Sequence, residues 1–277
     1  MKKTLILLLS ASLLLCAGGC AAAAPDPEAT QNVGPDASTL SGDLTKEPPA
    51  DITCVEPVYW HMKVIQVYEN YALVDNAEDG EGPGLCHMYV RDKAIYRVGE
   101  QGTLSFDALK PGMLLEVIGG PVGKSYPGQF TASAVGIMAD DDDLVGLYWQ
   151  VFQALWEVDP GLNSGIARLG LDFARSGLTP QEQEALAFLA VQELGLPYVT
   201  GTWAELADQG YIDREHLYWE DGLFLSIEVT GEMEDGTFTF NAEKWRSGLG
   251  AIYYSECRAE KGEDGVWSYT LGGFAIA

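Results

Sequence analysis

The sequence predicts an α+β protein, in which a small five-stranded β-barrel precedes a domain of helices packed on an antiparallel sheet. Between residues 54 and 140 the apolar residues occur in short runs separated by turn residues, a pattern typical of a small barrel or sandwich. From residue 144 onward, helical periodicity comes first and strand alternation follows, which is the α+β order. We therefore expect four segments: 1–19, 20–51, 52–139 and 140–277.

Residues 1–19 have the features of a secretory signal peptide. Lys2 and Lys3 precede an apolar stretch at 5–15 that is short for a membrane span, and small residues lead to Cys20. This segment resembles the lipobox of bacterial lipoproteins, although Ala17 stands where that family usually has leucine. The resemblance implies that Cys20 is lipidated and becomes the first residue of the mature chain. The alternative is cleavage near Ala24 and release of an unanchored protein.

Residues 20–51 are rich in alanine, proline, aspartate, threonine and glycine and contain few bulky side chains. Such a segment cannot bury enough apolar surface to form a core. We therefore predict a disordered tether that holds the folded part away from the membrane.

The predicted barrel consists of strands at 58–67, 71–74, 85–90, 113–118 and 130–138. Turn segments precede the fourth and fifth strands, namely Leu109-Lys110-Pro111-Gly112 and Ser125-Tyr126-Pro127-Gly128-Gln129. These segments, with the strand order around them, resemble the YobA-type small β-barrel domain of unknown function found in secreted lipoproteins of Gram-positive bacteria. The resemblance implies an oligonucleotide/oligosaccharide-binding-like (OB-like) barrel and a lipid-anchored location on the outer face of the cytoplasmic membrane. It implies no activity.

Three helices are predicted after the acidic run 140–143. An apolar stripe begins at Leu144 and ends before Asp159-Pro160. Thr179 and Glu182 form a capping box for a helix that runs to residue 194, with Gly195 after it, and Thr202 begins a shorter helix that ends near residue 210. A strand is expected at 166–173.

The C-terminal part alternates like strands, predicted at 223–229, 236–241, 250–258 and 266–276. Asp-Gly pairs at 221–222, 235–236 and 264–265 are hairpin-turn signals, so we expect an antiparallel meander. The segments 243–250 and 267–269 resemble the C-terminal halves of uncharacterised lipoproteins from anaerobic Gram-positive bacteria, which adds no function.

The chain is strongly acidic, with 41 Asp and Glu against 16 Lys and Arg and a formal net charge of −25 over 277 residues. A protein of this charge is repelled by nucleic-acid phosphates, so DNA and RNA are excluded as partners. Removal of residues 1–19 would take away two lysines and no acid. The predicted contact with the membrane is therefore the lipid anchor and not an electrostatic surface.

No motif in the sequence specifies a chemistry. A nucleophile elbow, a phosphate-binding loop, a dinucleotide fingerprint and a paired-histidine helix are all missing, so we predict no catalytic residue, cofactor or metal. Cys257 and His216 lack the local pattern of a thiol enzyme. The loop 75–84 and the run 140–143 do not have the spacing of a calcium loop. The abundant carboxylates leave a hydrolase acting on an envelope polymer open.

Alternation along the first and third strands predicts an outward face that could bind a ligand. Trp60, Met62 and Val64 would point inward, as would Cys86 and Met88, which leaves a candidate binding face of Tyr59, His61, Lys63, His87 and Tyr89. The two histidines could bind a transition metal, but no third ligand is identifiable. Parity also places Cys54 on the side of Cys86, so a disulfide between them is a candidate that the sequence leaves open.

Three functions remain compatible with these observations. The first is a non-catalytic, lipid-anchored binding or scaffolding protein whose ligand or protein partner the sequence does not identify. The second is a hydrolase of a cell-envelope polymer that uses carboxylates, and the third is an accessory lipoprotein of envelope stress. The missing catalytic motifs favour the first.

Overall fold

The computed structural model describes residues 58–77, 82–91, 94–234 and 236–277. The predicted signal peptide, Cys20, the tether and Cys54 lie outside them. The described residues belong to one compact unit, Val55–Ala277. None of the helices in this described part of the chain is long and apolar enough to span a membrane.

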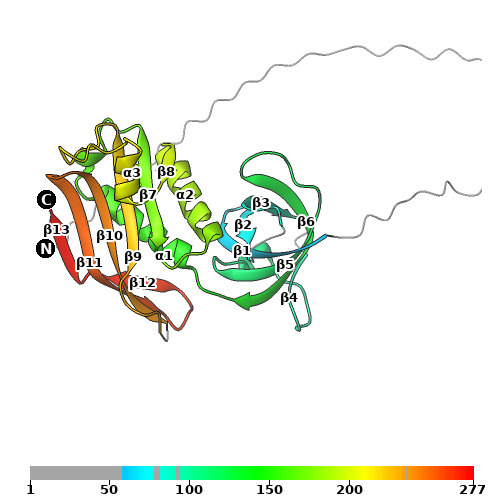
Figure 1. Cartoon of the computed structure of the whole chain (residues 1–277). Helices are drawn as coiled ribbons and strands as arrows, with labels where there is room; N and C mark the ends of the chain where they lie inside the picture. Colours follow the sequence, from blue (N-terminus) through cyan, green and yellow to red (C-terminus); the bar gives the residue numbers. More distant parts are fainter. Residues whose placement is uncertain (1–57, 78–81, 92–93, 235) are drawn as a thin grey trace, which may run out of the picture. The chain divides into compact units, whose positions relative to one another are not determined.

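Five strands close into a small barrel, as the sequence predicts (Figure 1). The ring consists of β1 (Val58–Val67), β2 (Ala72–Asn76), β3 (Cys86–Val90), β6 (Gly128–Asp140) and β5 (Met113–Gly119), and β5 returns to β1. Neighbouring strands are antiparallel except β3 and β6, which run parallel. The predicted strands agree with these bounds to within about two residues at each end.

A sixth short strand, β4 (Ile95–Arg97), lies outside the ring and was not predicted. It pairs in parallel with the second half of β6, and a 3-10 turn (Phe106–Ala108) follows it. A segment of three residues is too short to show strand alternation. It is a strand because it pairs with β6, and not because its own residues favour one.

The barrel interior is filled by alternate side chains of its strands, as alternation predicts. Met62, Val64, Cys86 and Met88 are at most 1% exposed and belong to one apolar cluster. A bulge in β1 between Val64 and Gln66 interrupts the alternation. Ile65, before the bulge, keeps the outward parity and belongs to a second apolar cluster, which contains the first two helices. Beyond the bulge the parity changes, and Val67 packs against the barrel cluster.

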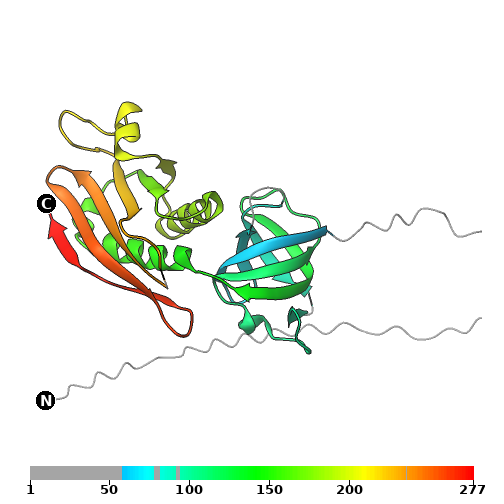
Figure 2. The ribbon, with the colours of Figure 1, turned by 60° about the horizontal axis from the view of Figure 1, so that its bottom comes forward.

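The second sheet has the strand order β12-β11-β10-β9-β7-β8 (Figure 2). The bounds of these strands are β7 (Arg168–Arg175), β8 (Tyr198–Thr200), β9 (Gly222–Val229), β10 (Thr237–Ser247), β11 (Gly250–Lys261) and β12 (Trp267–Thr270). A further strand, β13 (Gly273–Ile276), pairs with β11 beside β12. The fold is therefore a mixed α+β one, with more strand than helix.

The prediction of an antiparallel second sheet is correct only for β9 to β12 and β13, because β7 runs parallel to both β8 and β9. A helix follows β7 before each of these partners is reached, and such crossovers join parallel strands. The Asp221-Gly222 pair is consequently not a hairpin turn, because β9 begins at Gly222. The predicted strand 266–276 is two strands, β12 and β13.

The helices begin and end where their caps predict. Helix α1 (Leu144–Glu157) is capped by Asp143, whose Oδ1 accepts a hydrogen bond from Gly146 N at 2.8 Å. Helix α2 (Pro180–Leu194) has the predicted capping box of Thr179 and Glu182 and ends at Gly195 in the left-handed conformation. The short helix α3 (Trp203–Asp208) repeats the capping box with Thr202.

Two apolar clusters cover the two faces of the second sheet. Helices α1 and α2 pack on one face in the largest cluster, which also takes in Ile65, Leu73 and Leu85 from the barrel strands and the segment before β3. A smaller cluster on the other face joins Leu206 of α3 to Trp219 and Trp245. The predicted boundary at residues 139 and 140 falls between the end of β6 and the start of α1, and independent folding of the two parts stays a prediction.

Candidate ligand-binding site

Aromatic rings form a continuous strip on the outer surface of the barrel and along α2. Tyr71 stacks on Tyr68 with ring centroids 4.5 Å apart, and it lies 4.8 Å from His87 and 5.6 Å from Tyr89. Phe188 of α2 continues the contacts, 6.4 Å from His87 and 6.0 Å from Tyr126. We call these six residues the aromatic strip: Tyr68, Tyr71, His87, Tyr89, Tyr126 and Phe188.

The strip collects residues from four separate elements. Tyr68 and Tyr71 lie at the β1–β2 turn, which a hydrogen bond from Tyr68 N to Tyr71 O closes at 2.9 Å. His87 and Tyr89 point outward from β3, and Tyr126 lies in the β5–β6 loop. Tyr89 is 37% and Tyr126 is 63% exposed, so these two rings of the strip are accessible to solvent.

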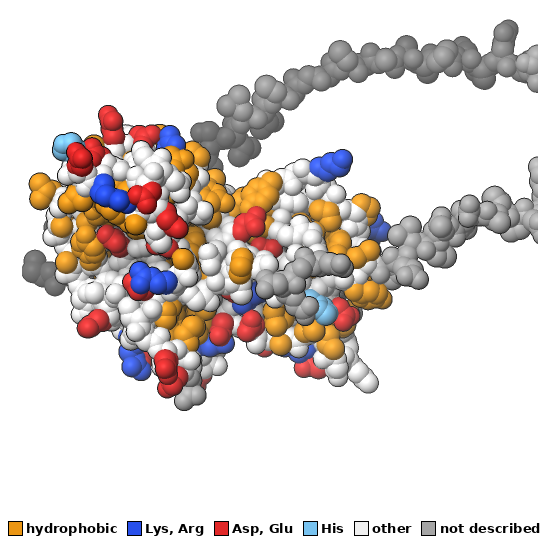
Figure 3. All heavy atoms as spheres, in the orientation of Figure 1, with side chains coloured by type: hydrophobic (Ala, Val, Ile, Leu, Met, Phe, Trp, Pro, Cys, Tyr) orange, Lys and Arg blue, Asp and Glu red, His pale blue; other side chains and the backbone are white. Residues whose placement is uncertain are grey.

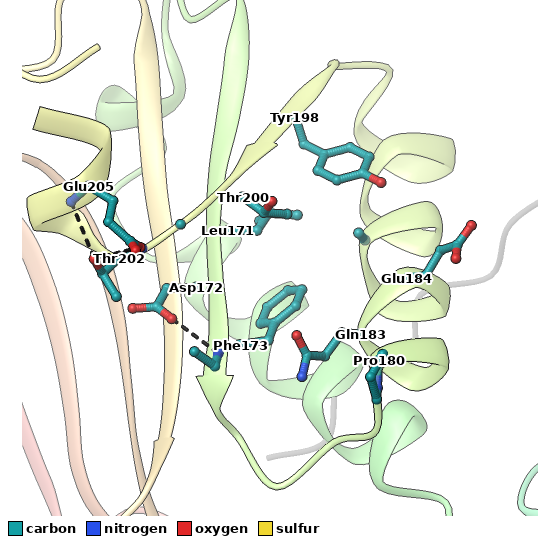
Figure 4. A pocket seen from close by; sticks show the side chains of 13 residues that line it. Leu171, Asp172, Phe173, Pro180, Gln183, Glu184, Tyr198, Thr200, Thr202 and Glu205 are labelled. Atoms are coloured by element: carbon teal, nitrogen blue, oxygen red, sulfur yellow. Dashed lines mark hydrogen bonds between the residues drawn. The ribbon is translucent and has the colours of Figure 1, made fainter. Parts of the chain in front are cut away.

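A pocket of about 430 Å³ lies between α2 and strands β7 and β8, next to the end of the strip (Figure 4). Tyr126 OH donates a hydrogen bond to Glu184 Oε1 at 2.7 Å, and Glu184 is part of the pocket wall. Figure 4 shows Tyr198 reaching from β8 toward α2, above Thr200 and Leu171 on the sheet. We call this space the acidic pocket, because Asp172, Glu184 and Glu205 line it.

Each carboxylate of the acidic pocket already accepts a hydrogen bond from the chain. Asp172 Oδ1 accepts from Ala174 N at 3.1 Å, and Glu184 accepts from Tyr126. Glu205 Oε2 accepts from the backbone N–H and the hydroxyl of Thr202, which lowers the pKa of Glu205. The pocket therefore presents positioned acceptors, with Gln183 and the hydroxyls of Tyr198 and Thr200 beside them.

The predicted outward face exists, but its members differ in accessibility. Tyr59 is 57% exposed, and His61 is also exposed. Tyr89 and His87 belong to the aromatic strip. Burial lowers the pKa of His87, and its Nε2 is buried without a hydrogen-bond partner in the described part of the chain.

Lys63 points outward from β1 as predicted, yet it is held between two carboxylates. Its Nζ lies 2.8 Å from Glu182 Oε1 and 3.0 Å from Asp141 Oδ2, and its side chain is 13% exposed. Burial works to lower the pKa of Lys63, but the hydrogen bonds and charges of Glu182 and Asp141 outweigh it, so the pKa is raised. Lys63 is thus an ion-pair partner of α2, which the barrel pattern alone could not reveal.

The described cysteines are buried thiols. Cys86 faces the barrel interior as predicted, with its Sγ 3.8 Å from the carbonyl oxygen of Pro83, and its pairing with Cys54 stays a prediction. Burial raises the pKa of Cys257 to about 11, the opposite of what an activated nucleophile requires. His216 is bonded elsewhere, with Nδ1 2.7 Å from Asp213 Oδ2.

Negative charge is spread over the molecule. On the face seen in Figure 3, acidic side chains are scattered and do not form a single patch. The run 140–143 is divided among different partners: Arg97 pairs with Asp140, Lys63 with Asp141 and Lys261 with Asp142. Among the described residues, no group of three or more His, Cys, Asp or Glu could hold a metal ion.

No protein-family model matches the chain, and neither a curated protein nor a solved structure matches it. The candidate site is therefore inferred from its geometry.

Sequence reasoning missed most of the strip and all of the pocket. Of the six residues of the strip, the face predicted from strand alternation included only His87 and Tyr89. The outward parity of Tyr71 with Leu73 was a further signal that the sequence offered. Phe188 lies 6.4 Å from His87 because the tertiary fold brings α2 to the barrel, and no sequence pattern reveals this contact. Tyr126 was used as a turn residue and not as a site residue.

Proposed function

We propose that the chain is a lipid-anchored, extracytoplasmic protein that binds a polymer of the cell envelope, and that it binds without catalysing a reaction. The observation that carries this proposal is the aromatic strip and its continuation into the acidic pocket. Flat aromatic faces beside hydrogen-bond acceptors suit sugars, which present apolar ring faces and hydroxyl donors. We therefore favour an oligosaccharide as the ligand.

An OB-like barrel would place its ligand on the same elements. OB folds bind oligonucleotides and oligosaccharides on the face of strands 2 and 3 and on the loops between strands 1 and 2 and strands 4 and 5. In this barrel β5 and β6 correspond to the fourth and fifth strands of the ring. The strip therefore occupies the β1–β2 loop, strand β3 and the β5–β6 loop, which are equivalent positions. The net charge of −25 disfavours the nucleic acid and leaves the saccharide.

Binding is favoured over hydrolysis by the state of the pocket carboxylates. A glycosidase needs one carboxylic acid that keeps its proton and a second carboxylate for the opposite role. In the acidic pocket the pKa of Glu205 is lowered, which holds it ionised, and Asp172 and Glu184 are engaged by a backbone N–H and a tyrosine hydroxyl. This arrangement supports positioning of hydroxyl groups and not proton transfer.

The test is co-sedimentation of the purified chain with insoluble peptidoglycan, together with analysis of the supernatant for released fragments. We expect saturable binding without fragments. Tyr89→Ala combined with Tyr126→Ala should raise the dissociation constant about tenfold or more, because removing two exposed aromatic contacts costs on the order of 1.4 kcal/mol or more.

Tyr59→Ala is the matched control, since Tyr59 is a more exposed tyrosine than Tyr89 on the same barrel and lies outside the strip. Equal loss of binding in this variant would move the contact surface to the wider face predicted from strand alternation. Release of fragments by the unaltered chain would reject the non-catalytic proposal.

The anchor is tested separately by Cys20→Ser. We expect this variant to accumulate unprocessed or to leave the membrane pellet, because no acyl chain can be attached to serine by the thioether chemistry of lipoproteins and stable anchoring needs two acyl chains. The measurement is the distribution between membrane pellet, soluble fraction and detergent phase. Normal maturation with unchanged detergent partitioning would show that Cys20 is not the anchor.

A further inference from the structure

A second cavity, of about 240 Å³, lies where the first turn of α2 faces strands β1 and β2. It is separate from the aromatic strip and the acidic pocket. Its polar wall includes Lys63, Asp75, Asn76 and Glu182, and its apolar wall includes Ile65, Leu114 and Met138. A polar end and an apolar side in one small cavity are the features of a site for a small amphipathic group.

Asp75 is the unusual residue in this cavity. It is only 2% exposed, and its Oδ1 accepts a hydrogen bond from Asn76 N at 2.7 Å. Its Oδ2 is buried without a hydrogen-bond partner within the described residues. A buried acceptor without a donor costs free energy, so this oxygen calls for a donor that the described residues do not supply.

The neighbouring cation does not satisfy Asp75. Lys63 Nζ is engaged by Glu182 and Asp141, at 2.8 and 3.0 Å. Burial raises the pKa of Asp75 to about 7, the backbone hydrogen bond from Asn76 opposes this rise, and the charges of Glu184 and Glu182 add to it. The field at Asp75 is therefore negative on balance, and it favours a ligand that brings positive charge.

We propose that this cavity binds a primary alkylammonium group. The ammonium donates a hydrogen bond to Asp75 Oδ2, and its alkyl stem packs on Ile65, Leu114 and Met138. A primary ammonium supplies N–H donors and one positive charge, which matches a free acceptor in a negative field. A neutral alcohol offers one donor and no charge, and a quaternary ammonium offers charge and no donor.

The experiment is a nuclear magnetic resonance titration of the isotope-labelled full chain with n-pentylammonium chloride at pH 8. We expect saturable shifts of the backbone amides of Asn76 and Ala77. Tetramethylammonium chloride and 1-pentanol are the two probe controls, because each lacks one of the required features. Either control binding as tightly as n-pentylammonium would overturn the proposal.

Asp75→Asn keeps the side-chain shape and removes the charge, so it should weaken n-pentylammonium binding at least tenfold. Asp107→Asn makes the same charge change at an exposed position that does not line the cavity and should leave binding unchanged. Circular dichroism verifies that both variants fold. Unaltered affinity in folded Asp75→Asn would reject the site.

The pH dependence of n-pentylammonium binding is a second test of the site, and it needs no variant. Affinity should be about tenfold lower at pH 6 than at pH 8, because Asp75 is mostly protonated at the lower pH. The charged and titratable groups around it are His61 and Lys63 of β1, Cys86 of β3, Tyr126 of the β5–β6 loop, Asp141 after β6, and Glu182 and Glu184 of α2. Asp75→Asn should abolish most of this dependence, and a full tenfold change in that variant would show that Asp75 is not the group responsible.

Discussion

Replacing Lys244 with methionine should lower the free energy of unfolding by roughly 3–5 kcal/mol, the range expected when one partner of a buried polar arrangement is removed. Lys244 lies on β10 and is 0% exposed. Its Nζ donates to the carbonyl oxygens of Leu155, Trp156, Val158 and Asp159 at 2.7 to 3.3 Å. One ammonium thus covers the C-terminal end of α1, where carbonyl groups have no helical donors.

Two effects of this substitution oppose each other. Methionine removes a buried charge whose burial lowers the pKa of Lys244 to about 8, and that removal is favourable. It also leaves buried carbonyl groups without a donor, and each costs about 1–3 kcal/mol. Trp156 O keeps a bond from Asn163 Nδ2 and Asp159 O keeps one from Leu162 N, but the oxygens of Leu155 and Val158 have no second donor in the described part of the chain. We expect the orphaned carbonyls to dominate.

Urea unfolding followed by circular dichroism at pH 7 measures the effect. Lys124→Met is the matched control, since Lys124 is exposed in the β5–β6 loop and its replacement should change stability by no more than about 0.5 kcal/mol. A Lys244→Met variant as stable as the unaltered chain would show that the ammonium contributes nothing beyond filling the space.

Local signals predicted the elements that depend on neighbouring residues. The capping boxes at Thr179 and Thr202 need only side chains three residues apart, and both helices begin where these residues predict. Strand alternation placed Met62, Val64, Cys86 and Met88 inside the barrel for the same reason. In each case the physical cause lies within a few residues of its effect.

Features that depend on distant residues could not be predicted in this way. Strand β8 has three residues and exists because it pairs with β7. The alternation of Phe238, Phe240 and Ala242 places Lys244 on the same apolar face, but the predicted strand ended at 241, whereas β10 continues to Ser247. Only α1 supplies the carbonyls that make a buried lysine acceptable on β10.

Asp75 shows the same limit at the candidate sites. The sequence analysis included it in an acidic loop at 75–84, whereas the structure places it within β2 and almost completely buries it. Its outward parity with Tyr71 and Leu73 was visible in the sequence. The helix that covers this face, and the carboxylates of that helix, come from more than 100 residues further along the chain.

Raising the pH from 4 to 8 should destabilise the chain relative to its Asp75→Asn variant, by an amount on the order of 4 kcal/mol. The pKa of Asp75 is about 7 in the fold and has its ordinary value near 3.8 in the unfolded chain. Each unit of that difference corresponds to about 1.4 kcal/mol. The folded state therefore binds the proton more tightly, and the stabilisation is complete below pH 4 and lost as the pH rises through 7.

The measurement is urea unfolding of both proteins at pH 4, 5.5, 7 and 8, expressed as the difference in unfolding free energy. At pH 4 the protonated carboxyl and the amide should be nearly equivalent, and at pH 8 the asparagine variant should be the more stable one. Other carboxylates titrate in both proteins and cancel in the difference, and Asp107→Asn controls for the loss of one negative charge. A difference that stays constant between pH 4 and pH 8 would mean that Asp75 is not desolvated in solution, and the cavity beside α2 would then be open to water and in no need of a cationic ligand.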